Sequence, residues 1–116
     1  MAAAVTDLAT QRLIQRAPDH ALALAAEDQA YLLGCLREIE AAFAVSAVPA
    51  LPLDRLPGRA LMRQLVGLRR TLRARDDDQR RALGRLASAI LLVDTACALD
   101  HDHLVAVAAR HGKSEE

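Results

Sequence analysis

The densest group of side chains that could do chemistry is Asp100-His101-Asp102-His103, followed by His111. Imidazole and carboxylate groups are common metal ligands, and His-x-His can supply two of them. On a helix, however, residues two apart point about 200° apart, so His101 and His103 converge only if the turn is irregular. Asp100 also suits a helix N-cap and Asp102 a first turn. We therefore predict a capping role, and keep a metal site of His101, Asp102 and His103, or a pH-sensitive contact, as alternatives.

A second candidate is Asp94, which lies within an apolar stretch that is typical of a buried helix. An unpaired carboxylate in such a place is very costly, so it must have a partner. We expect an arginine of the segment 59–75, or of another chain, to form a structural ion pair with it. A functional carboxylate in a pocket is the alternative.

The positive charge is concentrated in residues 55–85, which hold ten arginines and three aspartates, although the formal net charge of the chain is zero. Four of these arginines fall within about 80° of one helix face, opposite a stripe of leucines. They are Arg59, Arg63, Arg70 and Arg73. The face could be simply solvated, could contact nucleic-acid phosphates, or could meet an acidic protein or a membrane surface. The pI of about 6.9 and the lack of interleaved aromatic residues favour the solvated face.

The composition indicates the elements that must position these residues. Of the 116 residues, 53% are apolar but only 2% are aromatic, with five glycines and four prolines. This balance favours helix over strand and predicts an all-α domain at 1–112 with a frayed tail at 113–116. Helical periodicity and proline positions predict an antiparallel bundle of four main helices plus a short fifth, with a Pro-rich linker between the second and third. The expected helices are 4–16, 19–45, 59–75, 77–99 and 101–111, and the linker is 46–58.

The predicted helix 19–45 carries apolar residues at alternating spacings of three and four, which is typical of a seam for a partner helix. Its second half supplies the residues that we call the seam: Leu32, Leu36, Ile39 and Phe43. The spacing continues for longer than a compact bundle of this size needs. We therefore predict that the seam is the interface of a homodimer.

The sequence offers little sign of export or of membrane insertion. Cys35 and Cys97 are far apart and lie in apolar helical stretches, which indicates reduced, buried thiols. The longest uncharged apolar stretch, Leu86 to Val93, has eight residues, whereas a membrane span needs about 20. The first residues lack a basic and an apolar signal region. We expect a cytoplasmic protein without a membrane span, and fourteen arginines against one lysine suggest a GC-rich bacterial genome.

The stretch Leu83 to Arg110, with Ala98-Leu99-Asp100 between two expected helices, resembles the end of the all-α nucleotide pyrophosphohydrolases of the MazG-like group. In that family, acids in an E-x-x-E and E-x-x-D set hold magnesium around a nucleoside triphosphate. Here the segment that should carry E-x-x-D reads Ala82-Leu83-Gly84-Arg85, and the earlier helix offers Glu27-Asp28-Gln29-Ala30, with one acid of its pair. The resemblance therefore implies a degenerate or divergent relative with most of its metal site lost.

The sequence contains no nucleotide-binding loop, no nucleophilic-serine motif and no zinc-protease motif. It also predicts no cofactor. The favoured function is a non-enzymatic helical protein–protein interaction module, such as a small adaptor, regulator or chaperone-like protein, acting as a homodimer. The first alternative is a nucleic-acid-binding regulator that uses the arginine-rich helix 59–75. The second is the divergent pyrophosphohydrolase-like protein.

Overall fold

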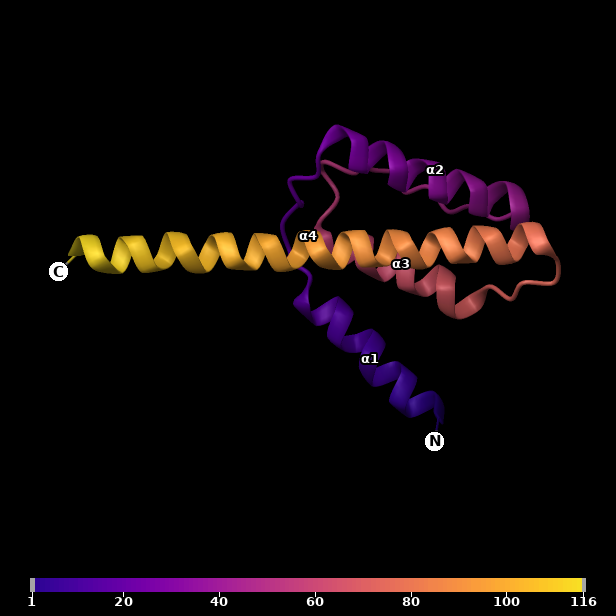
Figure 1. The fold of residues 1–116 in the computed structure, drawn as a ribbon, viewed down its shortest axis with the longest axis horizontal. Coiled ribbons are helices and arrows are strands. Elements are labelled where there is room, and N and C mark those ends of the chain that lie inside the picture. The colour runs from indigo at the N-terminus through magenta and orange to yellow at the C-terminus, as the bar shows by residue number, and fades with distance from the viewer. Residues whose placement is uncertain (1, 116) are drawn as a thin grey trace.

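The computed structural model describes residues 2–115, and it describes side chains from residue 8 to residue 110. This part of the chain is all-helical, with four helices and no strand. They are α1 (Ala2–Arg16), α2 (Ala26–Phe43), α3 (Gly58–Thr71) and α4 (Asp77–Glu115). Figure 1 shows α2 and α3 lying along the first half of α4, while α1 lies obliquely against α3 and α4.

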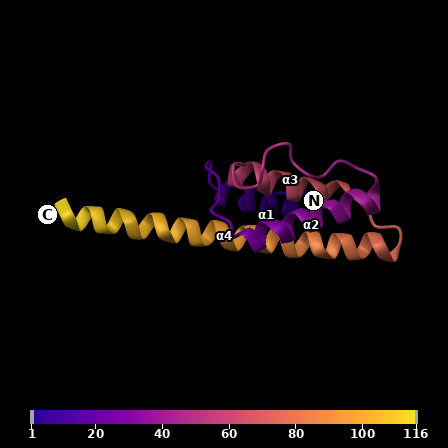
Figure 2. The ribbon, with the colours of Figure 1, turned by 90° about the horizontal axis from the view of Figure 1, so that it is seen from above.

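The helices do not alternate in direction along the chain, as they would in a simple antiparallel bundle. α2 and α3 run the same way, and α4 runs back between them (Figures 1 and 2). The reason is the segment 44–57, which returns along the whole length of α2 before α3 begins. Its apolar side chains Ala47, Leu53 and Leu56 are buried, so the return is packed against the helices.

Two polar side chains, Glu40 of α2 and Gln64 of α3, hold that return segment to the helices. The backbone N–H groups of Ala47 and Val48 donate to Glu40 Oε2 over 2.9 and 3.2 Å, and these bonds lower the pKa of the Glu40 carboxyl. Gln64 of α3 donates from Nε2 to the carbonyl of Ala47 over 2.8 Å. The segment thus connects the end of α2 to α3 by hydrogen bonds as well as by apolar contacts.

The core lies between α4 and the two helices beside it. Its largest fully buried side chains include Leu32, Leu36, Ile39, Leu61, Met62, Leu65, Leu86 and Val93. Three of the four seam residues are in this set, and Phe43 packs against it partly buried. The prediction that the seam is an interface with a second chain is therefore wrong, because α4 of the same chain covers it.

The first quarter of the expected helix 19–45 is not helical. The N–H groups of Gly58 and Arg59 donate to the carbonyls of His20 and Pro18 over 2.9 and 2.8 Å, which holds this stretch in extended form. A Cβ atom on Gly58 would come within 2.8 Å of Pro18 Cδ, so only glycine allows the close approach. Pro18 therefore lies in a backbone contact and does not open a helix, and α2 begins only at Ala26.

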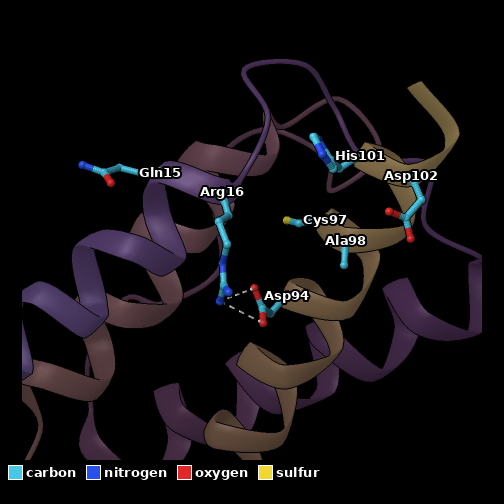
Figure 3. Close-up of a pocket in the computed structure, with 7 residues that line it drawn as sticks. All are labelled: Gln15, Arg16, Asp94, Cys97, Ala98, His101 and Asp102. Carbon is cyan, nitrogen blue, oxygen red and sulfur yellow. Dashed lines mark hydrogen bonds and ion pairs between the residues drawn. The ribbon is translucent and has the colours of Figure 1, made fainter. Parts of the chain in front are cut away.

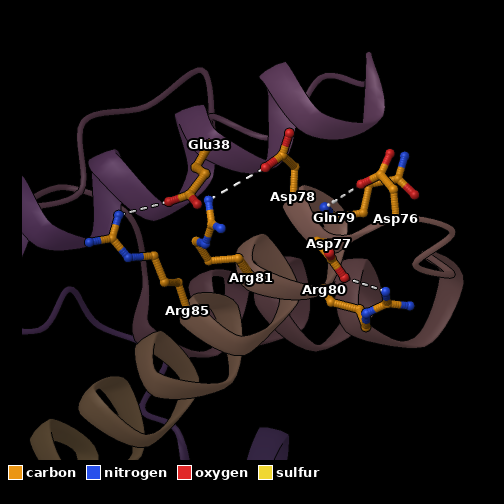
Figure 4. Close-up of polar contacts among 8 residues, drawn as sticks. All are labelled: Glu38, Asp76, Asp77, Asp78, Gln79, Arg80, Arg81 and Arg85. Atoms are coloured by element: carbon orange, nitrogen blue, oxygen red, sulfur yellow. Dashed lines mark hydrogen bonds and ion pairs between the residues drawn. The ribbon is translucent and has the colours of Figure 1, made fainter.

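The start of α4 is capped by the side chains of Asp76 and Gln79. The N–H of Gln79 donates to Asp76 Oδ1 over 2.8 Å (Figure 4). Gln79 Oε1 accepts from the N–H of Arg75 over 2.7 Å. Gln79 also donates from Nε2 to the carbonyl of Ala42, 3.0 Å away. One side chain therefore both caps α4 and ties it to the end of α2.

The expected break at Asp100 and the separate fifth helix are wrong. α4 is a single helix of 39 residues that continues through Asp100 to Glu115, and none of the described glycines has a positive φ. The turn at Asp100 contains no proline or glycine to stop the helix. The expected frayed tail at 113–116 is helical as far as Glu115. Beyond the other helices, α4 projects alone (Figures 1 and 2).

Candidate interaction site at the projecting end of α4

The part of α4 that leaves the other helices is here called the projecting segment, residues 98–110. Nearly all of its side chains are exposed, including large apolar ones. Leu99 is 65% exposed, Leu104 50% and Val105 55%. These values are unusual for leucine and valine in a folded helix, and their concentration in one segment indicates a surface for association.

Five side chains of the projecting segment share one side of the helix, which we call the docking face. At 100° per residue they span about 120° of arc, while Leu99 lies on the opposite side. The docking face consists of Ala98, His101, Leu104, Val105 and Ala108. It has an apolar centre of Leu104 and Val105, with smaller or polar side chains toward either end.

The docking face leads directly into a hollow where α4 meets the end of α1. The hollow has a volume of about 430 Å³ and has polar side chains on both its α1 wall and its α4 wall (Figure 3). Its lining comprises Gln15, Arg16, Asp94, Cys97, Ala98, His101 and Asp102. Because Ala98 and His101 belong to both, the hollow and the docking face form one continuous surface.

Asp94 lies at the floor of this hollow and is paired with Arg16. Nη2 of Arg16 lies 3.1 and 3.2 Å from the two carboxylate oxygens. The partner thus comes from α1, and the expectation of an arginine from 59–75 is wrong. The Asp94 side chain is 29% exposed and the Arg16 side chain 61%, so the pair sits at a wet opening and not in the core. Solvent at both groups makes this a weak ion pair.

A second side-chain contact to α4 lies six residues further along the helix. His20 Nε2 is 3.0 and 3.1 Å from the two carboxylate oxygens of Asp100. This contact, and not a helix cap, is the observed role of Asp100. Together the two pairs attach residues 16–20 to α4 at the base of the projecting segment. Sequence spacing gave no sign of either pair, because both join residues about 80 positions apart.

Cys97 lines the hollow, but its thiol is almost covered at 3% exposure. Burial raises its pKa, and the nearby carboxylate of Asp94 acts in the same direction. Burial likewise raises the pKa of the Cys35 thiol. Both cysteines are free and stay neutral at physiological pH, which makes them poor nucleophiles.

The structure does not assemble the metal site considered for His101, Asp102 and His103. His101 and Asp102 line the hollow, whereas His103 is exposed and is not among its lining residues. Within the residues that the structure describes, no three His, Cys, Asp or Glu side chains are placed to hold a metal ion. The side chain of His111 lies outside the described part.

The four arginines expected to form one basic face have different roles. Arg59 donates to the carbonyls of Ile14 and Gln15 over 3.3 and 3.4 Å and pairs with Asp19 at 2.7 Å, so it caps the end of α1. Arg73 donates to the carbonyl of Arg70 over 3.1 Å. Arg63 and Arg70 are exposed. Two of the four side chains, Arg59 and Arg73, are therefore engaged in contacts with the chain itself.

Other arginines of the basic region are neutralised locally at the start of α4. Arg85 pairs with Glu38 of α2 at 2.8 Å, and Arg81 lies 3.4 Å from Asp78 (Figure 4). Arg80 pairs with Asp77. Much of the positive charge seen in the sequence is thus balanced by neighbouring carboxylates.

Comparison with protein-family models, curated proteins and solved structures finds no match to this chain. Its function must therefore be inferred from the packing and chemistry of the chain itself.

Proposed function

We propose that this protein is a non-enzymatic helical interaction module that acts as a homodimer through the docking face. The observation that carries the proposal is the continuation of α4 beyond the helices that cover its first half, with Leu104 and Val105 half exposed. The seam on α2 is covered by α4 of the same chain. We therefore place the dimer interface at the far end of α4.

Burial of the docking face in a dimer would be favourable, because its apolar side chains are exposed to water in the single chain. Each buried methylene group contributes about 0.8 kcal/mol, and Leu104 and Val105 stand at the centre of the face. A helix that projects without packing is also only marginally stable in water unless a partner covers it. Pairing of two projecting segments would supply both the burial and the support.

The contacts seen in the structure give less support to the two alternative functions. A nucleic-acid-binding surface at 59–75 needs free arginines, but Arg59 caps α1 and Arg73 folds onto its own helix. A pyrophosphohydrolase-like site needs a group of converging acids, and the described residues contain no such group. The two free, buried cysteines fit a reducing compartment, so we propose a cytoplasmic location.

A membrane is the competing partner for the same surface. By length and composition alone, the helix Asp77–Arg110 contains an 18-residue window that is apolar enough to cross a bilayer, with a mean hydropathy of 1.6. One such helix is weak evidence, because the core helix of a soluble protein has the same property, and the inner half of α4 is in the core. Insertion into a bilayer would also require the transfer of Asp94 and Asp100, with their partners, out of water, which is costly.

The test compares two leucines of the projecting segment that face opposite ways. We expect the unaltered protein to sediment as a dimer at micromolar concentration. Leu104→Asp should shift it to a monomer, because a charge would be buried in the centre of the docking face. Leu99→Asp, an equally drastic change at a more exposed leucine, should leave the dimer intact.

Circular dichroism should show that both variants keep the helical fold, since neither side chain is in the core. A monomeric unaltered protein, or equal loss of the dimer in both variants, would overturn the proposal. Binding of the unaltered protein to phosphatidylcholine vesicles in place of dimerisation would assign the surface to a membrane.

A further inference from the structure

We infer that the contact between His20 and Asp100 is a pH-sensitive latch, which holds the stretch 17–25 against the base of the projecting segment more firmly when His20 is protonated. The latch lies within one chain, so it goes beyond the proposed dimer and does not depend on it. Three features of the described chain lead to it: the geometry of the contact, the bonds on the other side of the stretch, and the charges at the junction.

The contact joins an ionisable ring to a carboxylate that is only partly exposed. His20 Nε2 lies 3.1 and 3.0 Å from the two oxygens of Asp100, whose side chain is 24% exposed. A neutral imidazole can donate to this carboxylate only in the tautomer that carries its hydrogen on Nε2. A protonated ring carries hydrogen on both nitrogens and adds the attraction of opposite charges. Histidine side chains make this change between about pH 8 and pH 5.

The stretch 17–25 is held to the rest of the fold from two sides. On the α3 side, the N–H groups of Gly58 and Arg59 donate to carbonyls of the stretch over 2.9 and 2.8 Å. On the α4 side, His20 contacts Asp100, which belongs to the projecting segment. When this contact opens, the projecting segment loses a tie to the rest of the chain, and the stretch loses one of the contacts that keep it on α3.

Two charged pairs flank the latch and are already balanced. Asp19 pairs with Arg59 of α3 at 2.7 Å, and Arg16 pairs with Asp94 of α4 at 3.1 Å. Each pair has no net charge, so neither opposes a positive charge on His20.

The other groups at the junction come from α4 and from the return segment 44–57. His101 and Asp102 follow Asp100 in the sequence, and both line the hollow. The two carboxylates give this turn of α4 a negative charge, which a positive His20 offsets. The return segment meets the stretch at the uncharged Pro57, through an isolated backbone bridge to the residue after His20. Because His101 is also a histidine, its protonation needs a control of its own.

Hydrogen exchange of two backbone amides tests the latch, because the N–H groups of Gly58 and Arg59 lose their acceptors when the stretch detaches. Protection factors would be measured by NMR at pH 5.5 and pH 7.5 on the unaltered chain and on His20→Gln. Glutamine is a neutral donor at both pH values. At pH 5.5 we expect protection in the unaltered chain to exceed that in His20→Gln by about two- to fivefold, the range for a half-exposed ion pair. At pH 7.5 the two should differ by less than about 1.5-fold, because the ring is then mostly neutral.

Two further variants serve as controls. His101→Gln changes the other histidine of the junction and should keep the pH dependence of the unaltered chain. Asp100→Asn removes the charged acceptor and should abolish that dependence. Equal protection in the unaltered chain and His20→Gln at pH 5.5 would overturn the inference, and so would loss of the pH dependence in His101→Gln.

Discussion

The inner and outer halves of α4 have the same kind of sequence but different surroundings. From Leu86 to Cys97, apolar residues at spacings of three and four are buried under α2 and α3. From residue 98 outward, similar residues at similar spacings are exposed. The difference teaches that periodicity reports which side of a helix is apolar. It does not report whether the chain itself supplies the covering partner.

The largest expected effect is a contrast between two leucines of α4. Leu86→Ala should lower the free energy of unfolding by about 2–5 kcal/mol, because Leu86 is fully buried and its loss leaves a cavity. Leu104→Ala, measured at concentrations where the chain is monomeric, should change it by less than about 0.5 kcal/mol. Urea denaturation followed by circular dichroism would measure both. Similar losses in the two variants would show that the outer half is packed after all.

An intermediate effect is expected at the start of the inner half. Asp76→Ala removes the acceptor for the N–H of Gln79 and should cost about 1 kcal/mol of stability. Asp76→Asn keeps an acceptor and serves as the matched control, with most of the stability retained. Thermal melts of the two variants would show the difference. If both variants melt like the unaltered protein, this cap does not contribute to the stability of the inner half.

The smallest effect is expected at the boundary between the two halves. Asp94→Ala breaks the pair with Arg16, but a 61% exposed guanidinium remains hydrated, so the loss should be only about 0.2–1 kcal/mol. Asp102→Ala, at a carboxylate of the same hollow, is the control and should be close to neutral. A loss of several kcal/mol would mean that Arg16 is stranded in a dry site. A higher melting temperature would instead mark Asp94 as part of a binding site.

Much of the fold was predictable because it depends on local signals. Composition predicted the all-α class, and periodicity with the proline positions predicted the end of the first helix at Arg16 and the start of α4 at Asp77. The late start of α2 was not predictable, since it depends on backbone bonds from residues 18 and 20 to the start of α3. Such contacts join residues that are far apart in the sequence, so no periodic sequence pattern indicates them.

For the site, individual residues could be predicted from the sequence, but not the contacts that bring them together. Asp94 stood out because a carboxylate interrupted an apolar stretch, and its need for an arginine followed from electrostatics. Which arginine it met depended on where α1 packs. The error about the seam has the same origin, because Leu36 could have packed on any helix with a matching face, and α4 of the same chain was the one available. The exposed face at Leu104 and Val105 could be recognised only once α4 was known to continue past Asp100.

The arrangement of α2, α3 and α4 has a consequence for how the protein is made. Within the described chain, α2 and α3 each pack on α4 but not on one another. A ribosome adds about 5–20 residues per second and delivers α4 last. While residues 77–97 are still missing, the apolar sides of α2 and α3 that pack on α4 have only α1 and the segment 44–57 nearby and lack their main covering surface. The nascent chain therefore stays open through most of its synthesis, and a chaperone that binds short apolar helices would meet it during that interval.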